Sequence, residues 1–186
     1  MTKDLFTFLT ETYPISDTIK TRIASMIKSK AYKKNEYLLR IGKVCNHICF
    51  IEKGLVRVCR MREDGVEVCS GLLCEGGLVI AVKSFFDREP SDEFIQALED
   101  TIVHYISHDE LESLYRDFVE YNIVGRLIVT RYYILSEQRN DMLRGVKARE
   151  KFALFQKNLG HLTPRVPRKD IASYLGITLE TLSRLA

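Results

Sequence analysis

The spacing of hydrophobic positions changes twice along the chain. Residues 5–28 have the spacing of two short helices separated near Pro14, with Ser16 or Asp17 as the N-cap of the second helix. From residue 31 to about residue 105, hydrophobic and polar positions alternate, and β-branched and aromatic residues are frequent. This second pattern predicts an antiparallel all-β unit that follows the helical segment.

The clearest strand segments in this unit are HICFIEKGLVRVCRM and GVEVCSGLL. The Glu63-Asp64-Gly65 stretch between them predicts a hairpin turn, because glycine allows a positive φ there. The strands follow one another too closely for crossover helices, which argues against a parallel sheet. We therefore expect a roll of the double-stranded β-helix or jelly-roll type.

After residues 107–109 the hydrophobic period becomes helical over a long run without proline. The main apolar stripe consists of Phe118, Tyr121, Gly125, Ile128, Tyr132, Leu135 and Met142. A second stripe beside it consists of Ile123, Leu127 and Ile134. A helix with two adjoining apolar faces needs two partners, and these can be the roll and a symmetry-related copy, with Gly125 permitting close approach. We expect a homodimer through residues 118–142; the alternative is that both stripes pack within one chain.

The C-terminal segment has the pattern of several short helices. Gly145 interrupts the helical run and is a candidate hinge, after which residues 146–159 form another helix and HLTPRVP forms a link. In the last segment, DIASYLGITLETLSR, Pro167 fits a helix start and Gly176 fits a left-handed helix end. Thr178 is then the N-cap of the final helix.

The apolar positions of this last segment fall where two crossed helices would meet. They are Ile171, Ala172, Leu175, Ile177, Leu182 and Leu185. The final helix would leave Glu180, Thr181, Ser183 and Arg184 outside, as a helix that enters the DNA major groove requires. The spacing therefore predicts a DNA-binding helix-turn-helix; the alternative is an ordinary pair of core helices.

Together these patterns predict an α+β chain in three parts. Residues 1–113 form a β-roll sensor domain with flanking helices, residues 114–144 a long dimerisation helix, and residues 145–186 a minimal helix-turn-helix domain. From Lys147 to the end, eight basic residues stand against three acidic ones, whereas the rest of the chain is slightly acidic. A basic end on an acidic body is typical of nucleic-acid binding.

The composition is 46% hydrophobic and 28% charged, which is typical of a globular protein. The sequence has neither a secretory signal nor an apolar run long enough to cross a membrane, so we expect a cytoplasmic protein and no membrane partner. The five cysteines are expected to be reduced and buried as small hydrophobic residues, with Cys45 and Cys49 as an alternative redox pair.

The β-roll, the long helix and the terminal RKDIASYLGITLETLSR resemble the Crp/Fnr superfamily of bacterial transcription regulators over essentially the whole chain, and the IEKGLVRV stretch is similar to the family's roll. The resemblance places Leu179, Glu180 and Arg184 at the three base-reading positions. Phosphate contacts are expected from Thr178, Ser183, Arg168 and Lys169. The complete set of candidate DNA-binding residues is Arg168, Lys169, Thr178, Leu179, Glu180, Thr181, Ser183 and Arg184.

Two features depart from the family pattern. An arginine is often found where this chain has Leu179, so the preferred DNA site is expected to differ, with Leu179 contacting a thymine methyl group. The link at residues 160–166 is shorter than the family's usual hairpin, and no strands follow the final helix. We therefore expect a minimal DNA-binding unit.

The resemblance also indicates where an effector would bind. Cyclic-nucleotide-binding members have a Gly-Glu pair and an Arg-Ser pair around the phosphate, and residues 80–81 and 91–92 fall at these positions. The charged partners are missing, Asp92 would repel a phosphate, and Lys83 is the only nearby cation. We expect no cyclic AMP, but a small apolar or weakly polar effector, or none. The candidate pocket residues are Ile80, Ala81, Val82, Lys83, Ser84, Ser91, Asp92, Ile134 and Leu135.

No other site stands out in the sequence. The four histidines, His47, His104, His108 and His161, lack the spacing of metal or haem ligands, and the cysteines lack an iron-sulfur motif. No catalytic constellation or P-loop is present, so we expect no metal, no cofactor and no enzyme activity. His108 fits a helix entry.

We therefore expect a homodimeric regulator that binds a near-palindromic site on double-stranded DNA, with RNA polymerase as a further candidate partner. The alternative function is a small-molecule sensor or protein-interaction module whose shortened helix-turn-helix no longer binds DNA.

Overall fold

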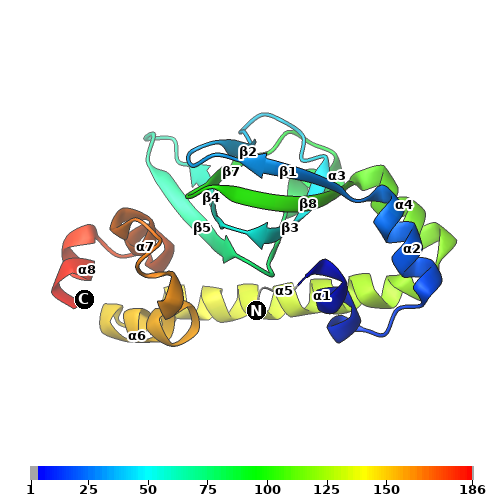
Figure 1. Ribbon diagram of the computed structural model, residues 1–186. Coiled ribbons are helices and arrows are strands. Elements are labelled where there is room, and N and C mark those ends of the chain that lie inside the picture. Colours follow the sequence, from blue (N-terminus) through cyan, green and yellow to red (C-terminus); the bar gives the residue numbers. More distant parts are fainter. Residues whose placement is uncertain (1–3, 186) are drawn as a thin grey trace.

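The computed structural model describes residues 4–185 (Figure 1), so residues 1–3 of the expected sensor domain and Ala186 of the expected DNA-binding domain lie outside the described residues. Two short helices come first, α1 (Leu5–Thr12) and α2 (Asp17–Met26). Ser16, rather than Asp17, is the N-cap of α2, because its hydroxyl accepts a hydrogen bond from the Ile19 N–H at 3.4 Å.

The roll consists of two antiparallel sheets, each with four strands. The first sheet has the order β1 (Lys28–Tyr32), β8 (Thr101–Ser107), β3 (His47–Lys53) and β6 (Leu78–Val79). The second has the order β2 (Tyr37–Leu39), β7 (Glu93–Ala97), β4 (Leu55–Met61) and β5 (Glu67–Cys74). The expected antiparallel, jelly-roll-like roll is confirmed.

The main hydrophobic core fills the space between the two sheets. Its fully buried side chains include Phe50, Ile51, Val56 and Val103. The expectation of an all-β unit was wrong at one place, because helix α3 (Val82–Asp87) lies within the roll. Phe85 of this short helix is fully buried in the core, so a helical segment supplies a core side chain at a place where a strand was expected.

The helical run after the roll is divided in two. Helix α4 (His108–Asp117) begins at His108 as expected, with a capping box between Ser107 and Glu110. Helix α5 (Tyr121–Gly145) then runs along the roll for 25 residues, and Figure 1 shows that it extends from the end where α1, α2 and α4 lie to the end where the C-terminal helices lie.

Gly125 of α5 serves a different purpose from the one expected. It is buried, and a Cβ atom added there would lie 2.4 Å from the hydroxyl oxygen of Tyr115 in α4. The glycine therefore lets α4 pack closely against α5 within one chain. The role proposed for it in a contact between two copies is corrected accordingly.

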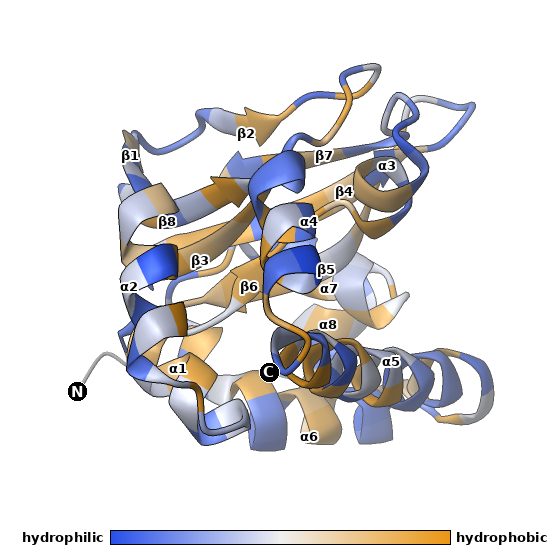
Figure 2. Ribbon diagram, turned by 90° about the vertical axis from the view of Figure 1, so that its right-hand side faces the viewer, coloured by the Kyte–Doolittle hydropathy of each residue, from blue (hydrophilic) through white to orange (hydrophobic). Residues whose placement is uncertain are grey.

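The chain ends in α6 (Ala148–Leu159), a short 3-10 turn η1 (Gly160–Leu162), α7 (Arg168–Leu175) and α8 (Leu179–Leu185). We call residues 148–185 the C-terminal unit. A second core lies between this unit and the outer face of the β4 sheet, and it contains Leu55, Phe94, Phe155 and Leu175. Strands β4 and β7 therefore contribute buried side chains to both cores, and hydrophobic colouring is visible along β4 (Figure 2).

Candidate nucleic-acid interface

Helices α7 and α8 form a helix-turn-helix held by a small apolar core. Ile171, Ala172, Leu175 and Leu182 are all buried. The turn is made by Gly176, whose φ of +61° is the left-handed conformation that glycine adopts without strain. A Cβ atom on Gly176 would also lie 3.2 Å from Leu143, so the turn packs against the end of α5.

The final helix begins as the sequence predicts. The Thr178 hydroxyl accepts a hydrogen bond from the Thr181 N–H at 3.1 Å, which is the N-cap interaction expected for α8. In Figure 1, α8 lies at the far end of the molecule from α1 and α2, on the outer side of the C-terminal unit.

The eight candidate DNA-binding residues lie on α7, α8 and the turn between them. Thr181 is half-buried and the other seven are exposed: Arg168, Lys169, Thr178, Leu179, Glu180, Ser183 and Arg184. Leu179 is the apolar member of this set and keeps 48% of its surface exposed. A guanidinium N–H of Arg168 lies 3.4 Å from the Ser183 hydroxyl, so the two helices present these side chains together.

A buried ion pair joins the helix-turn-helix to the roll. Arg57 of β4 donates a hydrogen bond to Asp170 of α7 at 2.8 Å, and both residues are buried, with 6% and 4% of their surface exposed. Arg57 also contacts Glu67 at 2.8 Å and donates two hydrogen bonds to Gln96. Since a buried charge is tolerated only when it is paired, this contact fixes α7 on the sheet.

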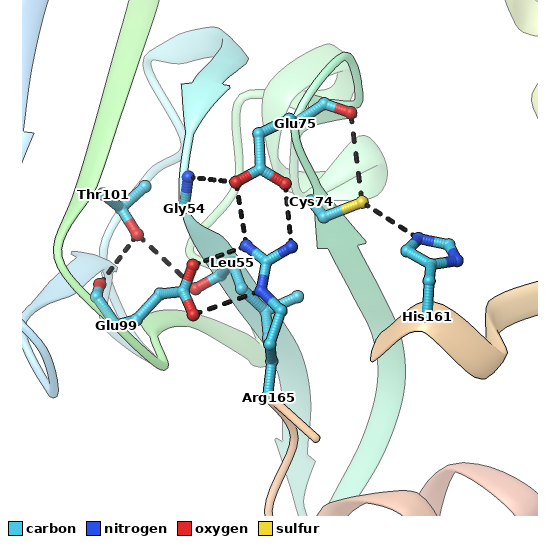
Figure 3. A network of polar contacts seen from close by, with 8 residues as sticks. All are labelled: Gly54, Leu55, Cys74, Glu75, Glu99, Thr101, His161 and Arg165. Atoms are coloured by element: carbon cyan, nitrogen blue, oxygen red, sulfur yellow. Dashed lines mark hydrogen bonds and ion pairs between the residues drawn. The ribbon is translucent and has the colours of Figure 1, made fainter. Parts of the chain in front are cut away.

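A second polar contact, shown in Figure 3, lies where the link before α7 crosses the roll. The Arg165 guanidinium sits between two carboxylates: it donates to Glu75 at 2.8 and 3.0 Å, and on its other side to Glu99. Glu75 also accepts a hydrogen bond from the Gly54 N–H at 2.8 Å. Arrangements of this kind, with an arginine bidentate to a carboxylate, are among the stronger polar contacts in proteins.

Glu75 has a lowered pKa. Partial burial alone would raise the pKa of this carboxyl, but the hydrogen bonds from Arg165 and from the Gly54 N–H outweigh burial and hold the pKa below its ordinary value of 4.5. The Arg165 pKa is raised by the same contacts, first that with Glu99 and then that with Glu75. The pair is therefore ionised at neutral pH.

This lowered pKa predicts that acid loosens the C-terminal unit. A carboxyl whose pKa is lower in the folded state contributes stability above its unfolded pKa and loses it as the pH falls through the folded value. We expect amide exchange of α7 to be constant from pH 7 to pH 5 once corrected for intrinsic rates, and to accelerate below the ordinary Glu75 pKa of 4.5. In Glu75→Gln the acid-dependent step should shrink; an unchanged step would assign it to other groups.

A groove of about 1430 Å³ lies between the roll and α5. Most of its lining is apolar. Three of the nine candidate effector residues line it, namely Ile80, Val82 and Leu135, whereas Ala81, Lys83, Ser84, Ser91, Asp92 and Ile134 do not. The structure therefore places only a minority of the candidate effector residues at one groove.

The candidates outside the groove have other partners. Ser84 accepts a hydrogen bond from the Cys45 N–H, and Ser91 donates to the Glu93 carbonyl. Lys83 pairs with Glu89 at 3.3 Å, and Asp92 lies 3.7 Å from Arg60 on the surface.

Among residues 4–185, no group of three or more His, Cys, Asp or Glu side chains is placed to hold a metal ion. No helix in that range has the length and hydrophobicity needed to span a membrane.

The docking of the C-terminal unit on the roll was not predicted from the sequence. One signal was present: in the strand Leu55-Val56-Arg57-Val58-Cys59, apolar residues point to both sides, which is typical of a strand covered on both faces. An arginine within such a strand needs a buried acceptor, but nothing in the pattern identifies Asp170 as that acceptor.

Comparisons with known proteins support the sequence resemblance. Residues 29–118 match the family model "Cyclic nucleotide-binding domain". The chain is 29% identical over 180 residues to the fumarate and nitrate reduction regulatory protein of Yersinia pestis, covering 85% of this chain and 67% of that protein. It is also 29% identical to the anaerobic regulatory protein of Haemophilus influenzae, over 85% of this chain and 65% of the relative. The chain thus spans about two thirds of the length of these curated relatives.

Solved structures show the same fold. FixK2 from Bradyrhizobium japonicum superposes with a TM-score of 0.73 at 21% identity, covering 86% of this chain and 82% of that one. The regulator CLP from Xanthomonas campestris also gives a TM-score of 0.73, at 14% identity, covering 91% and 89%. The fold is that of a cyclic-nucleotide-binding-type roll joined by a long helix to a helix-turn-helix. Both comparisons agree with the resemblance to the Crp/Fnr superfamily that the sequence predicted.

Proposed function

We propose that this protein is a DNA-binding transcription regulator that acts as a homodimer. The observation that carries the proposal is the division of α8 into two faces: Leu182 is buried against α7, while Glu180, Ser183 and Arg184 are exposed on the outer surface. A helix with a polar, solvent-facing side and a rigid support is what the major groove of DNA admits.

Within this proposal the exposed residues have different tasks. Glu180 accepts a hydrogen bond from a cytosine amino group, Arg184 donates to a guanine edge, and Leu179 contacts a thymine methyl group. Arg168, Lys169, Thr178 and Ser183 contact phosphates, and the half-buried Thr181 supports the helix start. The exposure of Leu179 supports its assignment to a thymine methyl group, because such a contact gives an apolar partner to an apolar side chain on an otherwise polar face.

Dimerisation is assigned to α5. Its second apolar stripe consists of Ile123, Leu127 and Ile134, and none of the three belongs to either hydrophobic core of the described chain. Two copies paired through this stripe carry two recognition helices, which read the two halves of a near-palindromic site. In this proposal residues 1–113 are the sensor domain, residues 114–144 the dimerisation helix and residues 145–186 the DNA-binding domain.

The roll is the sensor part of the proposal. The groove beside α5 is mostly apolar, and the charged partners of a cyclic nucleotide are missing from residues 80–81 and 91–92, which supports a small apolar or weakly polar effector rather than cyclic AMP. As a regulator of this kind the protein acts in the cytoplasm, has no enzyme activity of its own, and has RNA polymerase as a further partner. The rival proposal is a protein-interaction module that does not bind DNA.

The test is selection of binding sites from a random duplex library with the full chain and with Arg184→Ala. We expect enrichment of a two-fold symmetric site and a loss of about 1–3 kcal/mol of binding free energy in the variant, together with relaxed preference at one base pair of each half-site. Arg116→Ala, an exposed arginine on α4, is the matched control and should bind as the wild type does.

Two outcomes would reject the regulator in favour of the rival. The first is no enrichment of any site at low salt. The second is binding that shows no sequence preference and is equally weakened in Arg184→Ala and in the Arg116→Ala control.

A further inference from the structure

Two cysteines face each other beneath the C-terminal unit. Cys59 of β4 and Cys69 of β5 are paired residues in the antiparallel ladder, and both belong to the core shared with the C-terminal unit. They are fully buried, with 0% and 1% of their surface exposed. Cys45 and Cys49 were the alternative redox pair expected from the sequence, whereas the ladder brings Cys59 and Cys69 together.

The geometry of this pair is close to what a disulfide needs. Directly opposite residues of an antiparallel pair have Cβ atoms about 4.5–5.5 Å apart. A disulfide requires Cβ atoms about 3.5–4.5 Å apart, so the two strands must approach each other slightly. The ladder shifts register between Val58 and Cys59, where the pairing is irregular and such an adjustment is easiest.

The surroundings make one of the two thiols the better nucleophile. A hydrogen bond from the Cys69 thiol, aided by the charge of Arg57 and opposed by burial, lowers the pKa of Cys59. The same contact with Cys59, together with burial, raises the pKa of Cys69. One activated and one protonated thiol side by side is the arrangement that thiol–disulfide exchange uses.

The backbone of Cys69 is also a point of attachment for α7. Its N–H donates a hydrogen bond to the Ser173 hydroxyl at 2.9 Å. Its carbonyl accepts from Arg139 of α5 at 3.1 Å, and the same Arg139 nitrogen donates to the Tyr174 carbonyl at 3.2 Å. Any movement of Cys69 therefore reaches both α5 and α7.

We propose that Cys59 and Cys69 form a redox-active dithiol whose oxidation to an intramolecular disulfide loosens the C-terminal unit from the roll. The oxidant is a low-molecular-weight disulfide, which reaches the pair when the C-terminal unit opens locally. The Cys59 thiolate attacks one sulfur and releases the first small thiol, which takes up the Cys59 proton. Cys69 then attacks the Cys59 sulfur, gives up its proton and releases the second thiol. Two protein thiols are oxidised and one external disulfide is reduced, with no other reactant.

The experiment treats the full chain with glutathione disulfide and follows mass and amide exchange. We expect a product about 2 Da lighter than the reduced protein, with a peptide cross-link between Cys59 and Cys69, because two hydrogens are lost. In this product the α7 amides should exchange at least about tenfold faster than in the reduced protein, and dithiothreitol should restore the slow rate.

Three variants make the result specific. Cys59→Ser and Cys69→Ser should each lack the lighter product, whereas Cys74→Ser should retain it, although Cys74 is the most exposed of the five thiols. The proposal is overturned if the wild type yields no Cys59–Cys69 cross-link, or if the cross-linked protein keeps the slow α7 exchange. Neither readout depends on DNA, so the outcome is separate from that of the site selection.

Discussion

Replacing Asp170 by alanine is expected to lower the free energy of unfolding of the C-terminal unit by about 3 kcal/mol. The reason is that Arg57 would stay buried after losing its partner on α7. Removal of one member of a buried pair costs about 3–5 kcal/mol in general. The lower end applies here, because Arg57 keeps its contacts with Glu67 and Gln96. Denaturant unfolding, followed by amide exchange in α7 and in β4, measures the change.

Two further variants separate this mechanism from a general loss of charge. Asp92→Ala removes a carboxylate that lies on the surface with 65% of its side chain exposed, and it should change stability by less than about 0.5 kcal/mol. The double variant Arg57→Met with Asp170→Leu removes both charges and should lose less than Asp170→Ala alone. A double variant as unstable as the sum of its two single variants would show that the ion pair itself is not what holds α7.

The sequence predicted those elements whose pattern is local. The strands of the roll follow from alternation between 31 and 105, and the helix-turn-helix follows from Gly176 together with the apolar positions around it. These features depend on neighbours along the chain, where the physical rules for turns and periods apply directly. Helix α3 was missed because its six residues are too few to establish a helical period.

The contacts that could not be predicted join residues far apart in the sequence. Arg57 and Asp170 are separated by 113 positions, and Glu75 and Arg165 by 90. Each charge looks like a solvated surface residue in the sequence, since arginine and carboxylates are rarely buried. Gly125 is a third example. The sequence predicts that a neighbour approaches it closely, but it does not show that this neighbour is Tyr115 of another helix.

The contacts of the docked C-terminal unit link α7 and the turn before α8 to the roll and to α5. Helix α7 is fixed to the roll by Arg57, and the turn at Gly176 packs on the end of α5 at Leu143. Arg139 and Leu143 also line the groove between α5 and the roll. An occupant of that groove would therefore contact residues that also hold the C-terminal unit in place.

Replacing Ile134 by glutamate is expected to separate the proposed dimer and to lower affinity for a two-fold symmetric DNA site by about 10²–10⁴-fold. Ile134 has 50% of its surface exposed in the single chain, and it lies on the apolar stripe with Leu127 and Ile123. A carboxylate there would have to be buried without a partner if two copies met through this stripe. Each monomer would then bind only one half-site and lose the gain from the second. Sedimentation equilibrium and binding to a selected site measure the two effects.

Val129→Glu is the matched control, because Val129 is an exposed apolar residue of the same helix, with 56% of its surface exposed, and belongs to the groove side rather than to the stripe. Five residues separate the two positions, which places them about 140° apart around the helix axis. The control should stay dimeric. If Ile134→Glu remained dimeric while Val129→Glu became monomeric, the dimer would be formed through the groove side of α5, and the groove would then be closed by the second copy rather than open to an effector.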